Sequence, residues 1–286
     1  MSSKYLCAFC SNPLELTGDV CSDNGALKVG ICDSCGLKQL NSFFHVSTEY
    51  YADDNHFSEE PEAIRKRERS WNIKRMALLL KWIPGIRKLK VLDFGCGPGG
   101  FLEQSWKEME DICGFELSKR VCNINVKNGW RCFSSIGEVP PDREVIMLFH
   151  VLEHIPRPWD LLLSLRERFP HAETFVIEVP NTQEALNSLF QNAAYGRNHH
   201  SSEHLYYFSS ETLRRVVNAG GLAIEMETQV QRYSLANHLG WLKNNRGGGQ
   251  DVWPIFNDPQ LNENYEKLLV DQKVADSLFL ICIPSS

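Results

Sequence analysis

The sequence lacks any uninterrupted apolar run of the length that crosses a bilayer, which is about 18 residues or more. Its first residues also lack the apolar segment that a signal peptide requires. Neither sign of charge dominates, because 30 Lys and Arg stand against 36 Asp and Glu, for a net charge of −6. We therefore expect no membrane span, a cytoplasmic location, and a main partner other than nucleic acid.

Hydrophobic residues make up 43% and charged residues 23% of the 286 positions. That mixture is typical of folded rather than disordered chains and is ample for a core. The length fits one large domain or two modest ones.

The cysteines are unevenly spread, with five of the ten in the first 35 residues. Four of them form two C-x-x-C pairs, Cys7 with Cys10 and Cys32 with Cys35. Two such pairs about twenty residues apart favour a tetrahedral zinc site over redox-active or idle cysteines. Four thiolates leave no open coordination position, so we expect a structural zinc, with Cys21 as a spare.

A basic stretch runs from Ile64 to Lys90 and contains ten Lys or Arg. Its apolar spacing predicts a long amphipathic helix that ends near Pro84 and Gly85. The basic residues either form a solvated helix face or attract a phosphorylated substrate or an RNA backbone.

The strongest motif lies after a short apolar segment, 90–94, that predicts a buried strand. Gly95, Gly97 and Gly100 follow it in a G-x-G-x-x-G loop, which by itself suggests a dinucleotide. Asp93 decides between ligands, because a carboxylate there repels a pyrophosphate but attracts the ammonium and sulfonium groups of S-adenosylmethionine.

A second strand, 112–115, ends at Glu116, which is suited to accept hydrogen bonds from both ribose hydroxyls. Together with the loop, Asp93 and Glu116 resemble the first two motifs of class I methyltransferases. That resemblance covers residues 50–283 and implies an α/β fold: a doubly wound, Rossmann-like sheet of seven strands, preceded by the small zinc-binding module. A further phrase, 150–155, resembles the "hVLEHh" segment that ends the family's fourth strand beside the cofactor.

The resemblance implies S-adenosylmethionine as cofactor, and it assigns its site to the glycine loop and to the ends of the following strands. The predicted cofactor-binding residues are Asp93, Gly95, Cys96, Gly97, Gly99, Glu116, Leu117, Ser134, Ser135 and His150. We expect Glu153 and His154 to cap or orient the next helix.

The acceptor side is predicted from the segment 198–209, which resembles an "EHLxYFS" phrase of methyltransferases that modify sugars or surface glycans. Cys32–Asn41 resembles the zinc-binding arm of the deoxysugar C-methyltransferases. Their His and Glu of acid–base chemistry correspond to His204 and Glu203 here, whereas Ser201 stands in place of the family's Tyr. Those enzymes also carry a large C-terminal domain that this chain is too short to contain. We predict His204 as the base that activates the acceptor, with Glu203 and His150 also catalytic.

The predicted organisation is a zinc module at 1–45, a linker and basic helix at 46–90, and a methyltransferase domain at 91–286 with an acceptor-binding insertion at about 231–265. Arg232 and Arg246 in that insertion are expected to hold a phosphate or carboxylate. The expected acceptor is a hydroxyl or amine of a nucleotide-linked sugar or glycan intermediate, and the expected partner is therefore a small molecule, a sugar or phosphorylated sugar.

Two alternatives stay open from the sequence. One is an rRNA or tRNA methyltransferase with a zinc-ribbon arm, which the basic stretch favours and the acidic total opposes. The other is a non-catalytic scaffold that binds the cofactor and docks a partner through the zinc arm. An exposed arm also leaves room for an oligomer.

Overall fold

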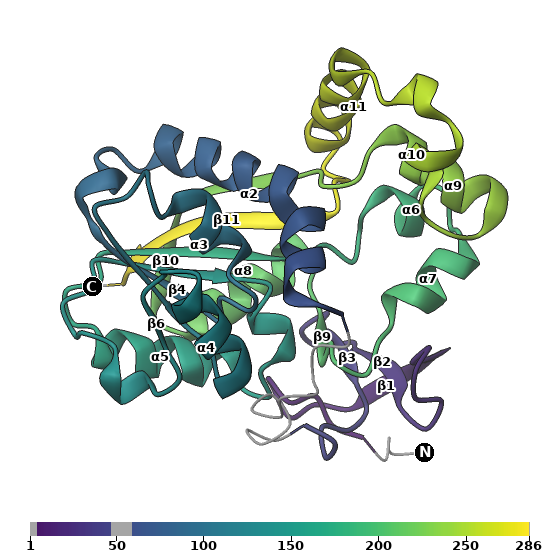
Figure 1. The fold of residues 1–286 in the computed structure, drawn as a ribbon. Helices are drawn as coiled ribbons and strands as arrows, with labels where there is room; N and C mark the ends of the chain where they lie inside the picture. The colour runs from purple at the N-terminus through teal and green to yellow at the C-terminus, as the bar shows by residue number, and fades with distance from the viewer. Residues whose placement is uncertain (1–4, 47–58, 286) are drawn as a thin grey trace.

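The computed structural model describes residues 5–46 and 59–285, so part of the predicted 46–90 linker lies outside the described residues. Its centre is a seven-stranded sheet with the order β10-β11-β8-β7-β4-β5-β6 (Figure 1). The strands are β4 (Lys90–Phe94), β5 (Asp111–Phe115), β6 (Cys132–Phe133), β7 (Val145–Phe149), β8 (Thr174–Pro180), β10 (Leu222–Val230) and β11 (Ser277–Pro284). All neighbours are parallel except β11, which runs antiparallel to both β8 and β10. The predicted Rossmann-like sheet of seven strands is confirmed.

The parallel strands are apolar on both faces because helices cover both sides of the sheet. In β7, Ile146 and Leu148 pack toward α5 (Pro158–Arg168) and α8 (Ser210–Ala219). Val145, Met147 and Phe149 belong to the opposite core, with α2 (Pro61–Trp82), α3 (Gly100–Ser105) and α4 (Lys119–Lys127). The alternation follows from the two-residue period of a strand.

The order of strands reverses direction between β4 and β7, where the chain winds outward to β5 and β6 and then returns to β7 and β8. In doubly wound sheets this switch point opens a crevice at the carboxyl ends of the strands. The glycine loop follows β4 and His150 follows β7, so both predicted site segments meet at this crevice.

The N-terminal residues form a second, small sheet of β1 (Leu14–Val20), β2 (Lys28–Cys32), β3 (Lys38–Leu40) and β9 (Tyr206–Tyr207). Three of its strands come from the predicted zinc module, but β9 belongs to the segment after the fifth strand of the large sheet. The pairing of Lys38 with Tyr207 and of Gln39 with Tyr206 ties the two parts of the chain together.

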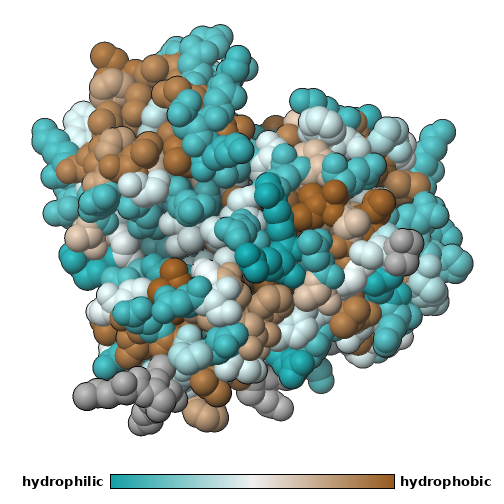
Figure 2. All heavy atoms as spheres, turned by 180° about the vertical axis from the view of Figure 1, so that it is seen from behind, coloured by the Kyte–Doolittle hydropathy of each residue, from teal (hydrophilic) through white to brown (hydrophobic). Residues whose placement is uncertain are grey.

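A helical lobe precedes the last strand and contains α9 (Leu235–Asn244), α10 (Gly249–Val252) and α11 (Pro259–Asp271). Two short helices, α6 (Ala185–Ser188) and α7 (Ala193–His199), follow β8. The lobe and the N-terminal module lie on the same side of the central sheet, with α7 between them (Figure 1). Apolar surface gathers on the lobe (Figure 2), where Val252, Ile255 and Leu268 are exposed. Among the described residues, none of the helices combines the length and apolar character needed to cross a bilayer.

Candidate active site

The glycine loop between β4 and α3 adopts a conformation that side chains disfavour. Gly95 and Gly99 have φ angles of +72° and +81°, in the left-handed region. A Cβ on Gly95 would lie 2.8 Å from Val151 Cγ2, and one on Gly99 would lie 2.6 Å from Asn125 Oδ1. The loop therefore requires glycine at both positions to stay close to the neighbouring segments.

Two buried carboxylates stand beside this loop. Burial raises the pKa of Asp93 to about 7; Glu116 adds to the rise, and Arg75 opposes it. Glu116 accepts hydrogen bonds from the backbone N–H groups of Gly97 at 3.0 Å and Ser118 at 2.8 Å. Each carboxylate oxygen has a second lone pair, so Glu116 retains the capacity to accept hydrogen bonds from two ribose hydroxyls.

His150 occupies the carboxyl end of β7 with a φ of +55°, which is uncommon for a residue with a side chain. Its Nδ1 lies 3.2 Å from Glu153 Oε1 and its Nε2 lies 3.2 Å from Glu178 Oε1. Burial and the nearby Arg232 oppose protonation, but the two glutamates outweigh them and raise the pKa of His150 above its usual value. The imidazole is thus held in place by charged partners on both of its nitrogens.

Two arginines border the same region. Arg75 of α2 forms a bidentate ion pair with Glu178, with a shortest contact of 2.7 Å, and its guanidinium lies 4.5 Å from the centre of the Phe149 ring. Burial works against ionisation of Glu178, yet Arg75 and His150 hold the pKa of its carboxyl well below the usual range. Arg232 pairs with Asp276 at 2.8 Å and also lies 3.0 Å from His150 Nε2.

The contacts of three basic side chains of α2 bear on the two interpretations of the basic stretch. Arg75 is turned into the core, Lys74 donates to the backbone carbonyl of Gln231, and Arg65 donates to that of Pro98. Arg75 is buried, whereas Lys74 is 37% exposed and pairs with Glu266. All three cations are engaged within the chain, which reduces the charge that α2 presents to an external phosphate or RNA.

The acceptor-side segment carries Glu203 and His204 and is held by the N-terminal module. Ser202 donates through its N–H and hydroxyl to Asp23, and its carbonyl oxygen lies 2.6 Å from His45 Nε2. Immediately after His204, β9 pairs with β3. The N-terminal module thus fixes where the His204 side chain can lie.

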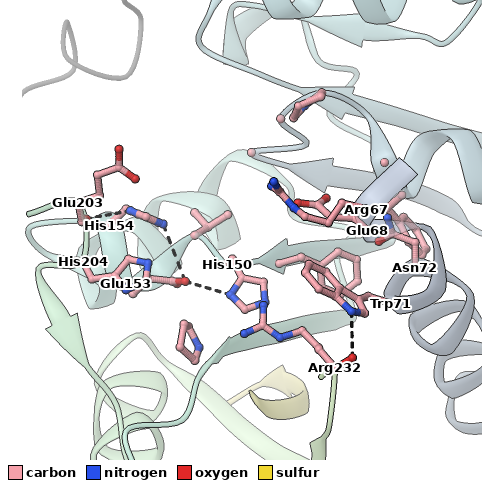
Figure 3. A pocket seen from close by; sticks show the side chains of 18 of the residues that line it. Arg67, Glu68, Trp71, Asn72, His150, Glu153, His154, Glu203, His204 and Arg232 are labelled. Carbon is pink, nitrogen blue, oxygen red and sulfur yellow. Dashed lines mark hydrogen bonds and ion pairs between the residues drawn. The ribbon is translucent and has the colours of Figure 1, made fainter. Parts of the chain in front are cut away.

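His204 faces the cavity together with Glu153 and His154 (Figure 3). The rings of His154 and His204 are 4.9 Å apart at an angle of 71°. Burial, reinforced by the nearby His154, lowers the pKa of His204 to about 3. The expectation that Glu153 and His154 cap or orient the next helix is wrong as to capping: Arg157 is the N-cap of α5, and no side chain caps it. Both side chains instead face the cavity, because a 3-10 turn, Leu152–His154, turns them back toward β7.

The predicted residues converge on one cavity of about 740 Å³, a volume within the range of ligand pockets. The predicted cofactor-binding and catalytic residues that line it are Asp93, Gly95, Cys96, Gly97, Glu116, Leu117, His150, Glu203 and His204. Arg232 of the predicted insertion also lines it, whereas Arg246 is not among the lining residues. Gly99 shapes the loop from behind, and the Cys96 thiol points toward Cys132, 3.7 Å away, so Cys96 presents its backbone. Ser134 and Ser135 follow β6 and are not among the lining residues, so their contact with the cofactor stays a prediction.

Sequence reasoning missed several residues that shape the cavity. Arg75 and Glu178 carry no motif, and their pairing across 103 positions leaves no local signal. Trp71 lines the cavity from α2 and donates its indole N–H to the Arg232 carbonyl at 3.1 Å. Its apolar ring on an otherwise basic helix is the available signal, but the spacing of apolar residues there indicates only an amphipathic face.

The four N-terminal cysteines come together away from this cavity. Cys7 and Cys35 have their Sγ atoms 3.6 Å apart, Cys10 and Cys32 have theirs 3.5 Å apart, and all four lie within 4.8 Å of one another. Tetrahedral zinc with Zn–S bonds of about 2.3 Å needs sulfurs separated by about 3.8 Å. The four thiols therefore fit a zinc ion without rearrangement of the backbone.

A family model described as a methyltransferase domain matches residues 63–227, and the chain belongs to that family. It is an S-adenosylmethionine-dependent methyltransferase. A comparison with curated proteins finds no match.

Two solved structures show the same fold. A chain from the Haloferax volcanii complex that contains the Trm112 methyltransferase activator is 12% identical, with a TM-score of 0.53 over 78% of this chain and 94% of that one. Magnesium protoporphyrin IX methyltransferase from Synechocystis PCC 6803, bound to SAH, is also 12% identical, with a TM-score of 0.50 over 78% and 86% of the two chains.

Proposed function

We propose that this methyltransferase acts on a hydroxyl or amine of a nucleotide-linked sugar or glycan intermediate. The observation that carries the proposal is the shared cavity, which joins the cofactor-type residues Asp93 and Glu116 to the polar segment 198–204. Side chains able to exchange protons or accept hydrogen bonds line its acceptor side together with the aromatic rings of Tyr195 and Trp241, a combination that suits a polyhydroxylated substrate.

On the cofactor side, Asp93 faces the charged methionyl portion and Glu116 accepts from the ribose. The described residues offer Asp93 no side-chain hydrogen bond, whereas its carboxylate lines the cavity. A buried carboxylate without such a partner is stabilised by a cationic ligand. S-adenosylmethionine supplies two cationic groups there.

The reaction is a displacement at the methyl carbon. The acceptor oxygen or nitrogen forms a bond to the methyl group, the S–CH3 bond breaks, and its electron pair remains on sulfur. The acceptor proton passes to a base, and we assign that role to His150, whose ring lines the cavity. Accepting the proton requires the neutral ring with its lone pair on Nε2, beside Arg232, and Glu153 and Glu178 would stabilise the imidazolium that forms. His204, the stronger candidate from sequence, is a weak proton acceptor because burial lowers its pKa to about 3; it and Glu203 position the acceptor.

The N-terminal cysteines Cys7, Cys10, Cys32 and Cys35 hold a structural zinc in this proposal, supported by the spacing of their sulfur atoms. The zinc would supply folding energy to a module too small to be stable alone. It lies outside the reacting groups.

The test is a screen of nucleotide sugars with the methyl-labelled cofactor, after calorimetry has established SAH binding. Transfer of label to a sugar, lost in His150→Gln while SAH binding persists, supports the assignment. Transfer to RNA alone, with binding that weakens steeply as salt increases, would replace the sugar by the RNA alternative. SAH binding without turnover on either acceptor class would favour the non-catalytic scaffold.

A further inference from the structure

Three side chains with metal-binding atoms meet on the acceptor side of the cavity. Glu153, His154 and His204 place a carboxylate oxygen and two imidazole nitrogens within 4.8 Å of one another. We propose that they bind a divalent transition-metal ion, distinct from the ion assigned to the four cysteines. The catalytic role of this metal site rests on the proposed function, whereas the binding of the metal does not.

Glu153 provides the first argument. It is fully buried, and its Oε1 lies 3.2 Å from His150 Nδ1. Its Oε2 is buried and has no hydrogen-bond partner among residues 5–46 and 59–285. A buried carboxylate oxygen without a partner is costly, and a cation bound to it removes that cost.

His154 provides the second argument. Its Nδ1 lies 2.9 Å from the backbone carbonyl oxygen of Glu203. A carbonyl can only accept, so Nδ1 of the neutral ring carries the proton and Nε2 carries the lone pair. A backbone carbonyl that fixes the tautomer in this way is the usual outer-shell partner of a metal-binding histidine. The Nε2 atom lies 3.9 Å from Glu153 Oε1, on the side where Glu153 and His204 face it (Figure 3).

The ligand set indicates the kind of metal. Two imidazoles and one carboxylate suit Mn²⁺, Fe²⁺, Co²⁺ or Zn²⁺ better than Mg²⁺ or Ca²⁺, which prefer oxygen alone. Ligand atoms bonded at about 2.0–2.2 Å lie roughly 3–3.5 Å apart, so small side-chain rotations close the present separations. Three protein ligands leave positions open for substrate.

Those open positions face the cavity where the acceptor binds. A metal there would bind the acceptor hydroxyl and lower its pKa, so that its proton would pass to a base more easily as the methyl group is transferred. The site therefore favours methylation on oxygen, because a bound alkoxide gains most from the metal charge.

The experiment measures Mn²⁺ binding to the zinc-loaded protein without cofactor or acceptor. Electron paramagnetic resonance counts free Mn²⁺ during a titration, and thiolate sites take up this hard ion poorly. We expect one Mn²⁺ per chain, with affinity at least about ten-fold weaker in Glu153→Gln and in His204→Gln, since even outer-shell losses cost about 10–100-fold. His171→Gln, an exposed histidine outside the cavity, is the matched control and should bind like the native protein.

Circular dichroism and SAH binding check that each variant is folded; if Glu153→Gln fails to fold, His204→Gln and His154→Gln carry the test. Absence of Mn²⁺ binding to the native protein overturns the proposal, as does binding that all folded variants retain. The two proposals fail separately. Mn²⁺ binding lost in the variants, together with inactivity on every sugar, retains the metal site and rejects the substrate class. Sugar methylation without Mn²⁺ binding does the reverse.

Discussion

Replacing Arg75 with methionine removes the positive charge that α2 inserts beside the cavity. The Arg75 and Glu178 side chains are only 7% and 1% exposed, and their shortest contact is 2.7 Å. Methionine keeps much of the apolar volume over the Phe149 ring but leaves the Glu178 carboxylate buried without its main partner. Breaking a buried pair in this way typically costs about 3–5 kcal/mol.

Urea unfolding of the native protein and of Arg75→Met at pH 7 measures this loss. Arg67→Met is the matched control on the same helix, because Arg67 and Glu59 are 50% and 52% exposed. A pair of that kind contributes about 0–1 kcal/mol. Equal and small losses in the two variants would refute the view that Arg75 neutralises Glu178.

The free energy of unfolding should also depend on pH differently in the native protein and in Arg75→Met. Arg75 lowers the pKa of Glu178 in the folded protein. The ionised carboxylate therefore stabilises the native fold fully above about pH 4.3, which is the usual pKa of Glu in an unfolded chain. This stabilisation is lost as the pH falls toward the lower pKa that Glu178 has in the folded protein. In Arg75→Met the pKa of Glu178 rises, and protonation at mildly acid pH removes the uncompensated charge. The stability difference between the two proteins should therefore narrow from pH 7 to pH 5, and Arg75→Met/Glu178→Gln should regain part of the loss at pH 7.

Three further predictions concern the ligands. Glu116→Ala should weaken SAH binding at least about ten-fold in calorimetry, because it removes one or two charged hydrogen bonds to ribose worth about 1.5–3 kcal/mol each; unchanged affinity would place the ribose elsewhere. Since the pKa of Asp93 is raised to about 7, an increase from pH 6 to 8 ionises it and should strengthen S-adenosylmethionine binding more than SAH binding, which lacks the sulfonium charge. An equal pH dependence of binding for the two ligands would show that Asp93 does not lie beside the sulfonium. Cys32→Ser should lower the zinc content, measured by atomic absorption, and abolish methyl transfer while SAH affinity changes less than about ten-fold; full turnover without zinc would contradict the structural role.

The sequence predicted the large sheet well because its signals are local. The strand bounds 90–94 were predicted as the structure has them, since this segment is a short apolar run that ends at a glycine loop. The cap of α8 is a local feature of the same kind, because the Ser209 side chain accepts from the N–H of Thr212. Such features depend on residues only a few positions apart.

The rest of the site depends on distant partners. The basic character of α2 indicated a solvated or phosphate-binding face, and nothing near Arg75 in the sequence identifies its buried partner. Glu153 and His154 sit at a position typical of a helix start, so a capping role was the natural expectation. Glu153 and His154 line the cavity because of the path that the chain takes after β7. His204, which is 50 positions after His154 in the sequence, approaches them only in the folded structure.

The N-terminal module bears on the acceptor side of the proposed mechanism but not on its cofactor side. Cofactor-side residues stand on β4, β5 and their loops, which fold within the large sheet alone. The acceptor-side segment is instead held by β3, Asp23 and His45, all from the N-terminal module. If the cysteine cluster sets the shape of that module, it also sets the position of His204, although it lies outside the cavity. Loss of the cluster should therefore separate cofactor binding from acceptor recognition, a division that a passive N-terminal appendage would not produce.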